Sequence, residues 1–371
     1  MIMGKIKVAI FGVGNCASAL VQGIYYYGKQ DYEKIPGLIH TVIGGYRLED
    51  IEFVLAVDID KRKVGKDLSE AIFSGSNCTV VFESDIPNTG VIVLKGQVLD
   101  GICEHTRDMF LVDEYQPEIT EEILIKLLKE SGVEIAVNYM PVGSTKATKF
   151  YARCCMKAGV GFINAMPVFI ASDKRWAKAF ERRGIPVLGD DVKSQVGATI
   201  VHRTLTKLFM DRGIKLLDTY QLNWGGNSDF KNMLSRSRLR DKKISKTSAV
   251  RSQIVGGIDD DNIHVGPSDY VPFLKDQKIC EIKMRGEKFG GVPLLLDLKL
   301  EVIDSPNSGG VIVDAIRLMK LALDRGIGGP LYSASAYLMK HPTTPFDNED
   351  QYCDEVAREM VEEYIRGDRE R

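Results

Sequence analysis

Close to its start the chain reads Lys7-Val-Ala-Ile-Phe-Gly12-Val-Gly14-Asn15-Cys16-Ala17-Ser18-Ala19-Leu20. A strand-like apolar run leads into a GxGxxA pattern, and a helix-like run follows it. Gly12 allows a tight turn, Gly14 leaves the backbone open to a pyrophosphate, and Ala17 lets the helix pack closely on the strand. The helix N-terminus also favours an anion. The sequence therefore predicts a dinucleotide-binding turn, and the alternative is a purely structural glycine turn. The candidate contacts are Gly12, Gly14, Asn15, Cys16 and Ala17.

After the glycine motif, Tyr25–Glu49 is expected to form a long loop. A second apolar run, Val54-Leu-Ala-Val-Asp58, then ends in an acid. In a dinucleotide-binding sheet, an acid at the end of the second strand holds the adenosine ribose. Asp58 is the candidate for that contact, and its negative charge favours NAD over NADP. The basic residues Lys61, Arg62 and Lys63 follow and weaken that preference, unless they only form a solvated helix face.

The first half of the chain alternates short apolar runs with helical stretches. A helix is expected over Thr120–Glu130 with Thr120 as its N-cap, and another over Ser172–Arg183 with Ser172 as its N-cap. Apolar runs separated by helices predict a parallel sheet covered on both faces, which is the Rossmann-type α/β class. The expected strands are Lys7–Phe11, Phe53–Val57, Val91–Leu94, Glu134–Tyr139, Gly161–Asn164 and Pro186–Leu188.

The periodicity changes after residue 198. Leu294, Leu296, Leu298 and Leu300 alternate with other residues, several of them polar, and period two predicts half-buried strands, here expected to be antiparallel. From Ile312 onward the apolar residues return to helical spacing, and the charged tail Glu362–Arg371 is expected to be disordered. We therefore expect an NAD-binding domain built from residues 1–197 plus 302–371, with an α+β insertion at 198–301.

Three polar stretches could carry chemistry. Gly189–Gly197 places two acids and small residues before a helix, which predicts either an anion-binding loop or a helix start capped by Asp191. Asn223–Asp229 could bind hydroxyls or a cation, or form only a turn. The basic run Lys231–Arg251 could be a solvated helix face, a nucleic-acid patch or a phosphate site; it lacks the interleaved aromatic residues of RNA-stacking surfaces.

Composition narrows the function classes. The formal net charge of −2 gives no general attraction to nucleic acid or to an anionic membrane, and no apolar run is long enough to span one. Seven scattered cysteines without a CxxC pair argue against a disulfide framework and a zinc site, so a cytoplasmic location is expected. The five histidines lack metal-ligand spacing, and no metal site is assigned.

Several longer blocks make the chain resemble the myo-inositol-1-phosphate synthase family, in its shorter prokaryotic form, over nearly its whole length. These blocks include Asn138-Tyr-Met-Pro-Val-Gly143, Phe162-Ile-Asn-Ala-Met-Pro167, Lys242-Lys-Ile-Ser-Lys-Thr247, Gly266-Pro-Ser-Asp-Tyr270, Asp304-Ser-Pro-Asn-Ser308 and Ser333-Ala-Ser-Ala-Tyr-Leu-Met-Lys340.

The resemblance implies an isomerase that converts D-glucose 6-phosphate to 1L-myo-inositol 1-phosphate. The substrate would be oxidised, enolised, closed by an intramolecular aldol step and reduced again with the same NAD. Some family members also need a divalent cation or ammonium. A cluster of cations suits this chemistry, because an enolate and an alkoxide develop beside a phosphate dianion. A homotetramer, with the insertion forming its interface, is also implied.

The resemblance also assigns roles to individual residues. The catalytic candidates are Lys242, Lys246, Lys278, Lys340, Asp297 and Asp191, with Asp297 and Asp191 orienting lysines. The substrate phosphate would be held by Ser194, Gln195, Gly197, Lys246 and Lys278. Further cofactor contacts would be Asp67, Ser131, Tyr151, Ser194, Asp229 and Lys242.

Two rival interpretations stay open from the residues alone. A conventional NAD-dependent dehydrogenase, similar to homoserine dehydrogenase, shares the fold class but leaves the lysine cluster unexplained. A non-catalytic NAD-sensing regulator needs the glycine loop but not the four lysines together.

Overall fold

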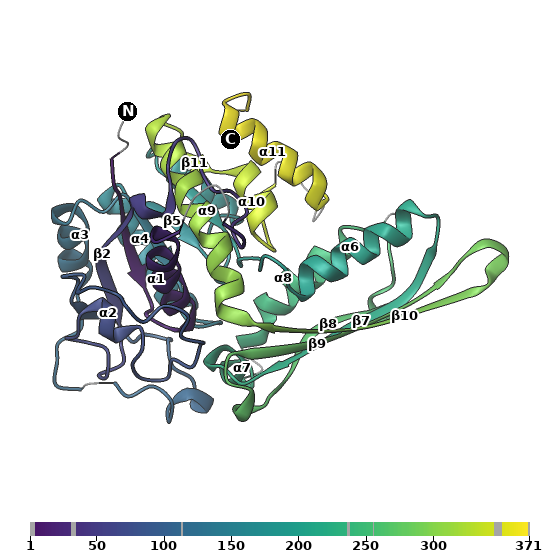
Figure 1. Ribbon diagram of the computed structural model, residues 1–371, viewed down its shortest axis with the longest axis horizontal. Coiled ribbons are helices and arrows are strands. Elements are labelled where there is room, and N and C mark those ends of the chain that lie inside the picture. Colours follow the sequence, from purple (N-terminus) through teal and green to yellow (C-terminus); the bar gives the residue numbers. More distant parts are fainter. Residues whose placement is uncertain are drawn as a thin grey trace.

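The computed structural model describes residues 4–30, 35–112, 114–235, 238–254, 256–344 and 351–369, with the side chains of 239–243 and 267–268 excepted. Within these ranges the strands form two sheets, and helices pack on both. Figure 1 shows the first sheet and its helices as a rounded body, from which the second sheet projects as a long arm.

The first sheet is parallel and has seven strands in the order β11-β6-β5-β4-β1-β2-β3. The six expected strands are present, and their order confirms the Rossmann-type class. The short strand β11 carries no alternating pattern, and the sequence did not indicate it. The strand bounds are β1 Ile6–Phe11, β2 Ile51–Asp58, β3 Val93–Lys95, β4 Ile135–Asn138, β5 Gly161–Asn164, β6 Pro186–Gly189 and β11 Gly329–Pro330.

Helices cover both faces of this sheet, as the continuous apolar strands require. One face packs against α1 (Asn15–Gly28) and α9 (Asp304–Asp324), together with α2 (Leu68–Ala71), α10 (Tyr332–Leu338) and α11 (Asp354–Arg366). The opposite face packs against α3 (Glu121–Glu130), α4 (Thr145–Ala158) and α5 (Lys174–Glu181).

The second sheet has the order β10-β9-β7-β8 and is inserted in the chain between β6 and β11. Its strands are β7 Lys215–Gly225, β8 Ile263–Tyr270, β9 Gln277–Glu287 and β10 Pro293–Ile303. The expectation of an antiparallel sheet is correct for β7, β9 and β10 but wrong for β8, which pairs parallel to β7. The chain crosses over through α8 (Leu239–Arg251) before β8, and such a crossover permits parallel pairing. Helices α6 (Ala198–Asp211) and α7 (Ser228–Asn232) complete this part.

Two local expectations at helix ends need correction. Thr120 caps α3 as predicted, but Asp173 rather than Ser172 caps α5, because the Ser172 hydroxyl donates to Asp190 instead. The charged tail from Glu362, predicted to be disordered, is helical as far as Arg366, because Val361 and Tyr364 are buried in the core.

In the part of the chain that the structure describes, no helix combines the length and apolarity needed to cross a membrane.

Short 3-10 turns join several of these elements. Their bounds are Leu48–Asp50, Glu104–Thr106, Asp260–Asn262, Pro272–Leu274 and Phe289–Gly291. The stretch from Tyr25 to Glu49, expected as one long loop, begins as the last turn of α1, which ends at Gly28.

Candidate functional site

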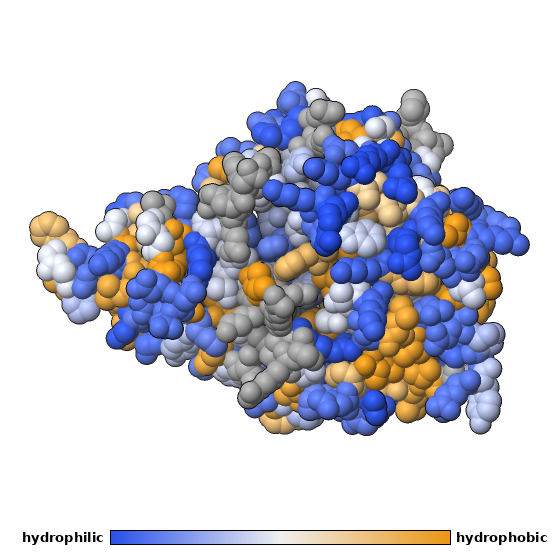
Figure 2. Space-filling view, turned by 180° about the vertical axis from the view of Figure 1, so that it is seen from behind, coloured by the Kyte–Doolittle hydropathy of each residue, from blue (hydrophilic) through white to orange (hydrophobic). Residues whose placement is uncertain are grey.

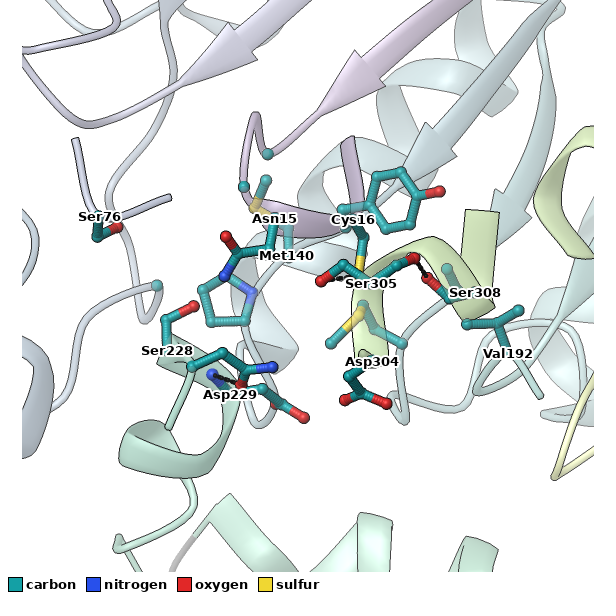
Figure 3. A pocket seen from close by; sticks show the side chains of 18 of the residues that line it. Asn15, Cys16, Ser76, Met140, Val192, Ser228, Asp229, Asp304, Ser305 and Ser308 are labelled. Carbon is teal, nitrogen blue, oxygen red and sulfur yellow. Dashed lines mark hydrogen bonds between the residues drawn. The ribbon is translucent and has the colours of Figure 1, made fainter. Parts of the chain in front are cut away.

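A pocket of about 1400 Å³, open to solvent, lies where the carboxyl ends of the first sheet meet the base of the second. The glycine loop, the end of β2, α7, the base of β9 and the start of α9 all contribute to its wall. Figure 3 shows Asn15, Cys16, Asp229, Asp304 and Ser305 around one common space, although they come from three helices. The insertion therefore completes a cavity that the first sheet only begins.

The glycine loop has the geometry that a dinucleotide requires. Gly12 has a φ of +95°, and a Cβ there would lie 2.8 Å from the carbonyl oxygen of Tyr139. A Cβ on Gly14 would meet no atom within 4 Å, although Gly14 lines the pocket. Helix α1 begins at Asn15, and Ala17 is fully buried against the sheet. The loop therefore presents open space and a helix N-terminus to an anion.

Asn15 and Cys16 line the same pocket. The Asn15 side-chain oxygen accepts hydrogen bonds from the backbone N–H groups of Cys78 (2.7 Å) and Thr79 (3.1 Å), which fixes that segment beside α1. The Cys16 Sγ lies 4.0 Å from the Ser305 Oγ. Burial raises the pKa of Cys16 to about 12, so its thiol stays neutral and shapes the pocket without adding charge.

Asp58 lies at the end of β2 and lines the pocket, as predicted from the sequence. Its carboxylate accepts three backbone hydrogen bonds, from Val13 at 2.7 Å, Ile59 at 2.7 Å and Asp60 at 2.9 Å. Lys63 is 1% exposed, with its Nζ 3.8 Å from the Asp58 Oδ2, so it does not belong to a solvated face. Asp58 thus braces the glycine loop while facing the pocket.

Three of the four candidate lysines converge. Lys246, Lys278 and Lys340 line both the main pocket and a small adjoining cavity, which also includes Ser194 and Gly197. They come from α8, β9 and the segment after α10. The small cavity also includes the first residues of α6, whose N-cap is Gly197. Cations and a helix N-terminus surrounding one small cavity make an anion site.

Two carboxylates partner these lysines. The Lys278 Nζ lies 3.0 Å from the Asp304 Oδ1, and the Lys340 Nζ lies 2.9 Å from the Asp191 Oδ1. Burial acts to lower the pKa of Lys278, but the hydrogen-bonded charge of Asp304 outweighs it and raises the pKa. Asp191 also accepts a hydrogen bond from the Ser245 Oγ at 2.7 Å, so it is not the helix cap considered from the sequence.

The other residues expected to contact the cofactor or substrate lie at different distances from the pocket. Tyr151, Ser194 and Asp229 line the main pocket. Lys242 lies on α8 about one turn before Lys246, but its side chain is outside the described residues. Asn227 caps α7, which favours the turn interpretation of its segment. Among the described residues, no group of three or more His, Cys, Asp or Glu side chains could hold a metal ion.

Comparison with known proteins decides the family. A model described as myo-inositol-1-phosphate synthase matches residues 197–305. The chain is 54% identical to the inositol-3-phosphate synthase of Mycolicibacterium smegmatis, covering 98% of this chain and 99% of that protein. The chain belongs to the myo-inositol-1-phosphate synthase family. The expectation from its sequence blocks is thereby confirmed.

Further comparisons agree. The inositol-3-phosphate synthase of Mycobacterium tuberculosis is 52% identical, covering 98% of this chain and 96% of that protein. A myo-inositol-1-phosphate synthase-related protein from Thermotoga maritima has a solved structure with a TM-score of 0.81 at 25% identity, covering 97% of this chain and 98% of that one. The same combination of a parallel sheet and an inserted sheet therefore occurs in a family relative.

Asp297 on β10, which the sequence suggested as the acid that orients a lysine of the site, does not have that position in the structure. Asp297 lies on the polar face of β10 as expected, but its side chain is 61% exposed and pairs with Lys283 at 3.4 Å. The described residues that line the two cavities do not include it. Asp304, at the start of α9, occupies the place beside Lys278. Asp304 belongs to a sequence block typical of the family, but strand alternation alone could not separate the two acids.

Ser131 also lies away from the site. It follows the C-terminal end of α3, before the start of β4, and the neighbouring Glu134 N–H bonds to the carbonyl oxygen of Lys7 at the beginning of β1. Gly12 follows the opposite, carboxyl end of β1. Because parallel strands bring their carboxyl ends to one edge, the cofactor contact assigned to Ser131 is wrong.

Gln195 is close to the anion cavity in sequence but does not line it in the described structure. Its side-chain amide donates to the carbonyl oxygen of Gly37 at 2.7 Å, and its backbone N–H donates to Asn307 at 2.9 Å. These bonds direct Gln195 toward Gly37 and α9, so it anchors the loop and does not line the anion cavity.

Asp67 caps α2 instead of facing the cofactor. Its Oδ1 accepts from the backbone N–H and the hydroxyl of both Ser69 and Thr89. Burial acts to raise the pKa of Asp67, but these donors lower it to about 2. The main pocket does not include Asp67 among its described lining residues.

We predict that Asp67→Ala destabilises the fold by about 2 kcal/mol, because an N-cap and buried hydrogen bonds are lost. NAD affinity should not change. Chemical denaturation and calorimetric titration with NAD measure the two effects. A variant with unchanged stability but weakened NAD binding would restore Asp67 to the cofactor site.

Proposed function

We propose that this chain is an inositol-3-phosphate synthase that converts D-glucose 6-phosphate to 1L-myo-inositol 1-phosphate with bound NAD. The observation that carries the proposal is the junction of two cavities. The pocket that contains the glycine loop and Asp58 adjoins a small cavity lined by Lys246, Lys278, Lys340 and the start of α6. A sugar phosphate held by these cations lies beside the inner end of the pocket.

The residues of the main pocket fit NAD. The open space at Gly14, together with the N-terminus of α1, suits a pyrophosphate, and Asp58 suits a ribose. The wall near Asp304 and Asp229 adjoins the lysine cavity and is the place for the nicotinamide. When bound, NAD supplies an acceptor for a hydride of the substrate and a donor that returns it.

The lysines then have separate tasks. Lys278, held as a cation by Asp304, and the buried Lys246 neutralise the substrate phosphate and the oxyanion that develops beside it. Backbone N–H groups at the start of α6, together with Ser194, donate to the phosphate. Lys340, paired with Asp191, and Lys242 transfer protons at C5 and its neighbours. A divalent cation or ammonium is an additional requirement that some family members have.

The test is to incubate the protein with glucose 6-phosphate and NAD and to assay the product as inositol phosphate. Many turnovers should occur without net NADH in solution, because the reaction is redox-neutral overall. Absorbance of NADH rising in proportion to product would favour the conventional dehydrogenase. Tight NAD binding without any turnover of glucose 6-phosphate would favour the regulator.

The assembly proposed for this chain is a homotetramer. Strand β10 is an edge of the second sheet, and Leu294, Leu296, Leu298 and Leu300 remain partly exposed on the face that α6 covers. Figure 2 shows apolar side chains gathered on the projecting arm. Open strand edges and half-covered leucines favour burial against another copy. Two further expectations stay predictions. One is the division into an NAD-binding domain (1–197 plus 302–371) and an inserted domain (198–301), and the other is the cytoplasmic location.

We predict that Leu296→Arg reduces the tetramer to smaller species, because it places a charge in the leucine stripe of β10. Leu295→Arg is the matched control, since Leu295 is 55% exposed on the opposite face of the strand. Light scattering at micromolar concentration measures both. A monomeric unmodified protein, or equal dissociation of both variants, would contradict the proposed interface.

A further inference from the structure

A cluster of charged side chains lies close to the lysine cavity. Its members are not among the described residues that line either cavity. Lys193 and Arg203 are each 1% exposed, and the carboxylate of Asp354 lies between them. The Lys193 Nζ is 2.8 Å from the Asp354 Oδ1, and the Arg203 Nε is 3.1 Å from the Asp354 Oδ2. The cluster joins the loop before α6, α6 itself and the first residue of α11 (Figure 1).

The guanidinium of Arg203 connects this cluster to further segments. It donates to the carbonyl oxygen of Ala249 near the end of α8 at 2.6 Å. It also donates to the Gln351 side chain at 3.1 Å and to the carbonyl oxygen of Tyr352 at 2.8 Å. Arg203 therefore fixes α8, which carries Lys246, relative to the segment that precedes α11.

The same cluster supports the backbone of Lys340. The Lys193 N–H donates to the carbonyl oxygen of Leu338 at 2.8 Å, and the Lys340 N–H donates to Asp191 at 2.7 Å. From the other side, the Gln351 amide donates to the carbonyl oxygen of Lys340 at 3.1 Å. Lys340 is thus held between two segments, and both are attached to Arg203 or Asp354.

Asp354 is the acid of this cluster, and it neutralises the two buried cations, Lys193 and Arg203. Burial acts to raise the pKa of Asp354, but the charges of Lys193 and Arg203 lower it, so the group is a carboxylate. Burial and the nearby Arg203 lower the pKa of Lys193 to about 8, against the opposing effect of Asp354. Removing the carboxylate would leave two buried cations uncompensated, and such charges are strongly unfavourable.

We propose that Asp354 and Arg203 are positioning residues, which hold Lys340 and the Lys246 turn of α8 in the substrate cavity without touching the substrate. The proposal rests on the proposed function. It assigns to the C-terminal helix, which lies outside the family match at residues 197–305, a part in the synthase reaction.

The test compares Asp354→Asn with Asp314→Asn. Asp314 is the control because it is also a carboxylate paired with a buried arginine: it lies 2.5 Å from the Arg317 guanidinium on α9, although it is fully buried whereas the Asp354 side chain is 24% exposed. It is ten residues beyond Asp304, or about 15 Å along the helix axis. Both variants should lose stability, because each leaves a buried arginine without its carboxylate.

Turnover should separate the two variants. A misplacement of about 1 Å in a catalytic group can cost roughly a hundredfold in rate. We expect Asp354→Asn to lower kcat about ten- to a hundredfold with NAD affinity unchanged, at a temperature where the variant is folded. Asp314→Asn should keep the kcat of the unmodified protein. Asp354→Glu and Arg203→Lys, which retain the charges, should recover part of the loss.

Normal kcat in folded Asp354→Asn, or equal losses in both variants, would overturn the positioning role. If Asp354→Asn does not fold, Arg203→Lys decides. It keeps a cation but loses the guanidinium hydrogen bonds to the carbonyl oxygens of Ala249 and Tyr352, so a normal kcat in this variant would also overturn the role. The unmodified protein, assayed in parallel, reports separately on the proposed function. If it made no inositol phosphate, that function would fail, and calorimetric affinity for glucose 6-phosphate would compare the variants instead.

Discussion

Lys278→Ala should lower turnover of glucose 6-phosphate by roughly a hundred- to a thousandfold, equivalent to about 2.7–4 kcal/mol of lost transition-state stabilisation. Lys278 lines both cavities and is held as a cation by Asp304 at 3.0 Å. Its ammonium is fixed before the reaction begins, so no reorganisation is needed when the oxyanion forms. NAD affinity should change much less, because the glycine loop and Asp58 are unaffected.

Lys283→Ala is the matched control for this prediction. Lys283 lies on the same strand, β9, and pairs with an acid of β10, Asp297, just as Lys278 pairs with Asp304. The described lining of the two cavities does not include Lys283. Steady-state kinetics should show normal turnover for Lys283→Ala. Near-normal turnover in Lys278→Ala would instead make Lys278 a structural base, and the substrate site assigned to the insertion would be abandoned.

Gly14→Val should abolish most NAD binding while the protein still folds. A Cβ at this position meets no protein atom within 4 Å, and its φ of −88° suits any residue. The added side chain would therefore occupy only the space where the pyrophosphate approaches the backbone. Hydrogen bonds to charged groups contribute about 1.5–3 kcal/mol each. Losing two of them weakens binding by about a hundred- to ten-thousandfold.

The control for Gly14→Val is Gly28→Val, at the other end of α1. Gly28 is exposed, and a Cβ there also meets nothing within 4 Å. Calorimetric titration should show normal NAD affinity for Gly28→Val, and circular dichroism should show a folded protein for both. Unchanged NAD affinity in Gly14→Val would remove the glycine loop from the cofactor site.

Local chemistry made much of this protein predictable. The turn between β1 and α1 depends on residues within one short segment, so Gly12, Gly14 and Ala17 could be interpreted from the sequence alone. Continuous apolar runs separated by helices likewise determined the parallel sheet, and the sequence blocks around the lysines determined the family. The two-residue strand β11 and the parallel pairing of β8 gave no such signal, since both depend on partners far away in the chain.

Only the tertiary structure decided which charged groups meet. Alternation along β10 showed that Asp297 lies on a polar face, but its position in the arm, away from the base, decides its partner. The β9–β10 register pairs Asp297 with Lys283 in the arm, while Asp304 follows at the base beside Lys278. Ser131 and Gln195 were assigned from the family resemblance, and their positions outside the cavities likewise appear only in the packed structure. Sequence specifies side-chain type and face, whereas distances across elements arise only when the two sheets and their helices pack.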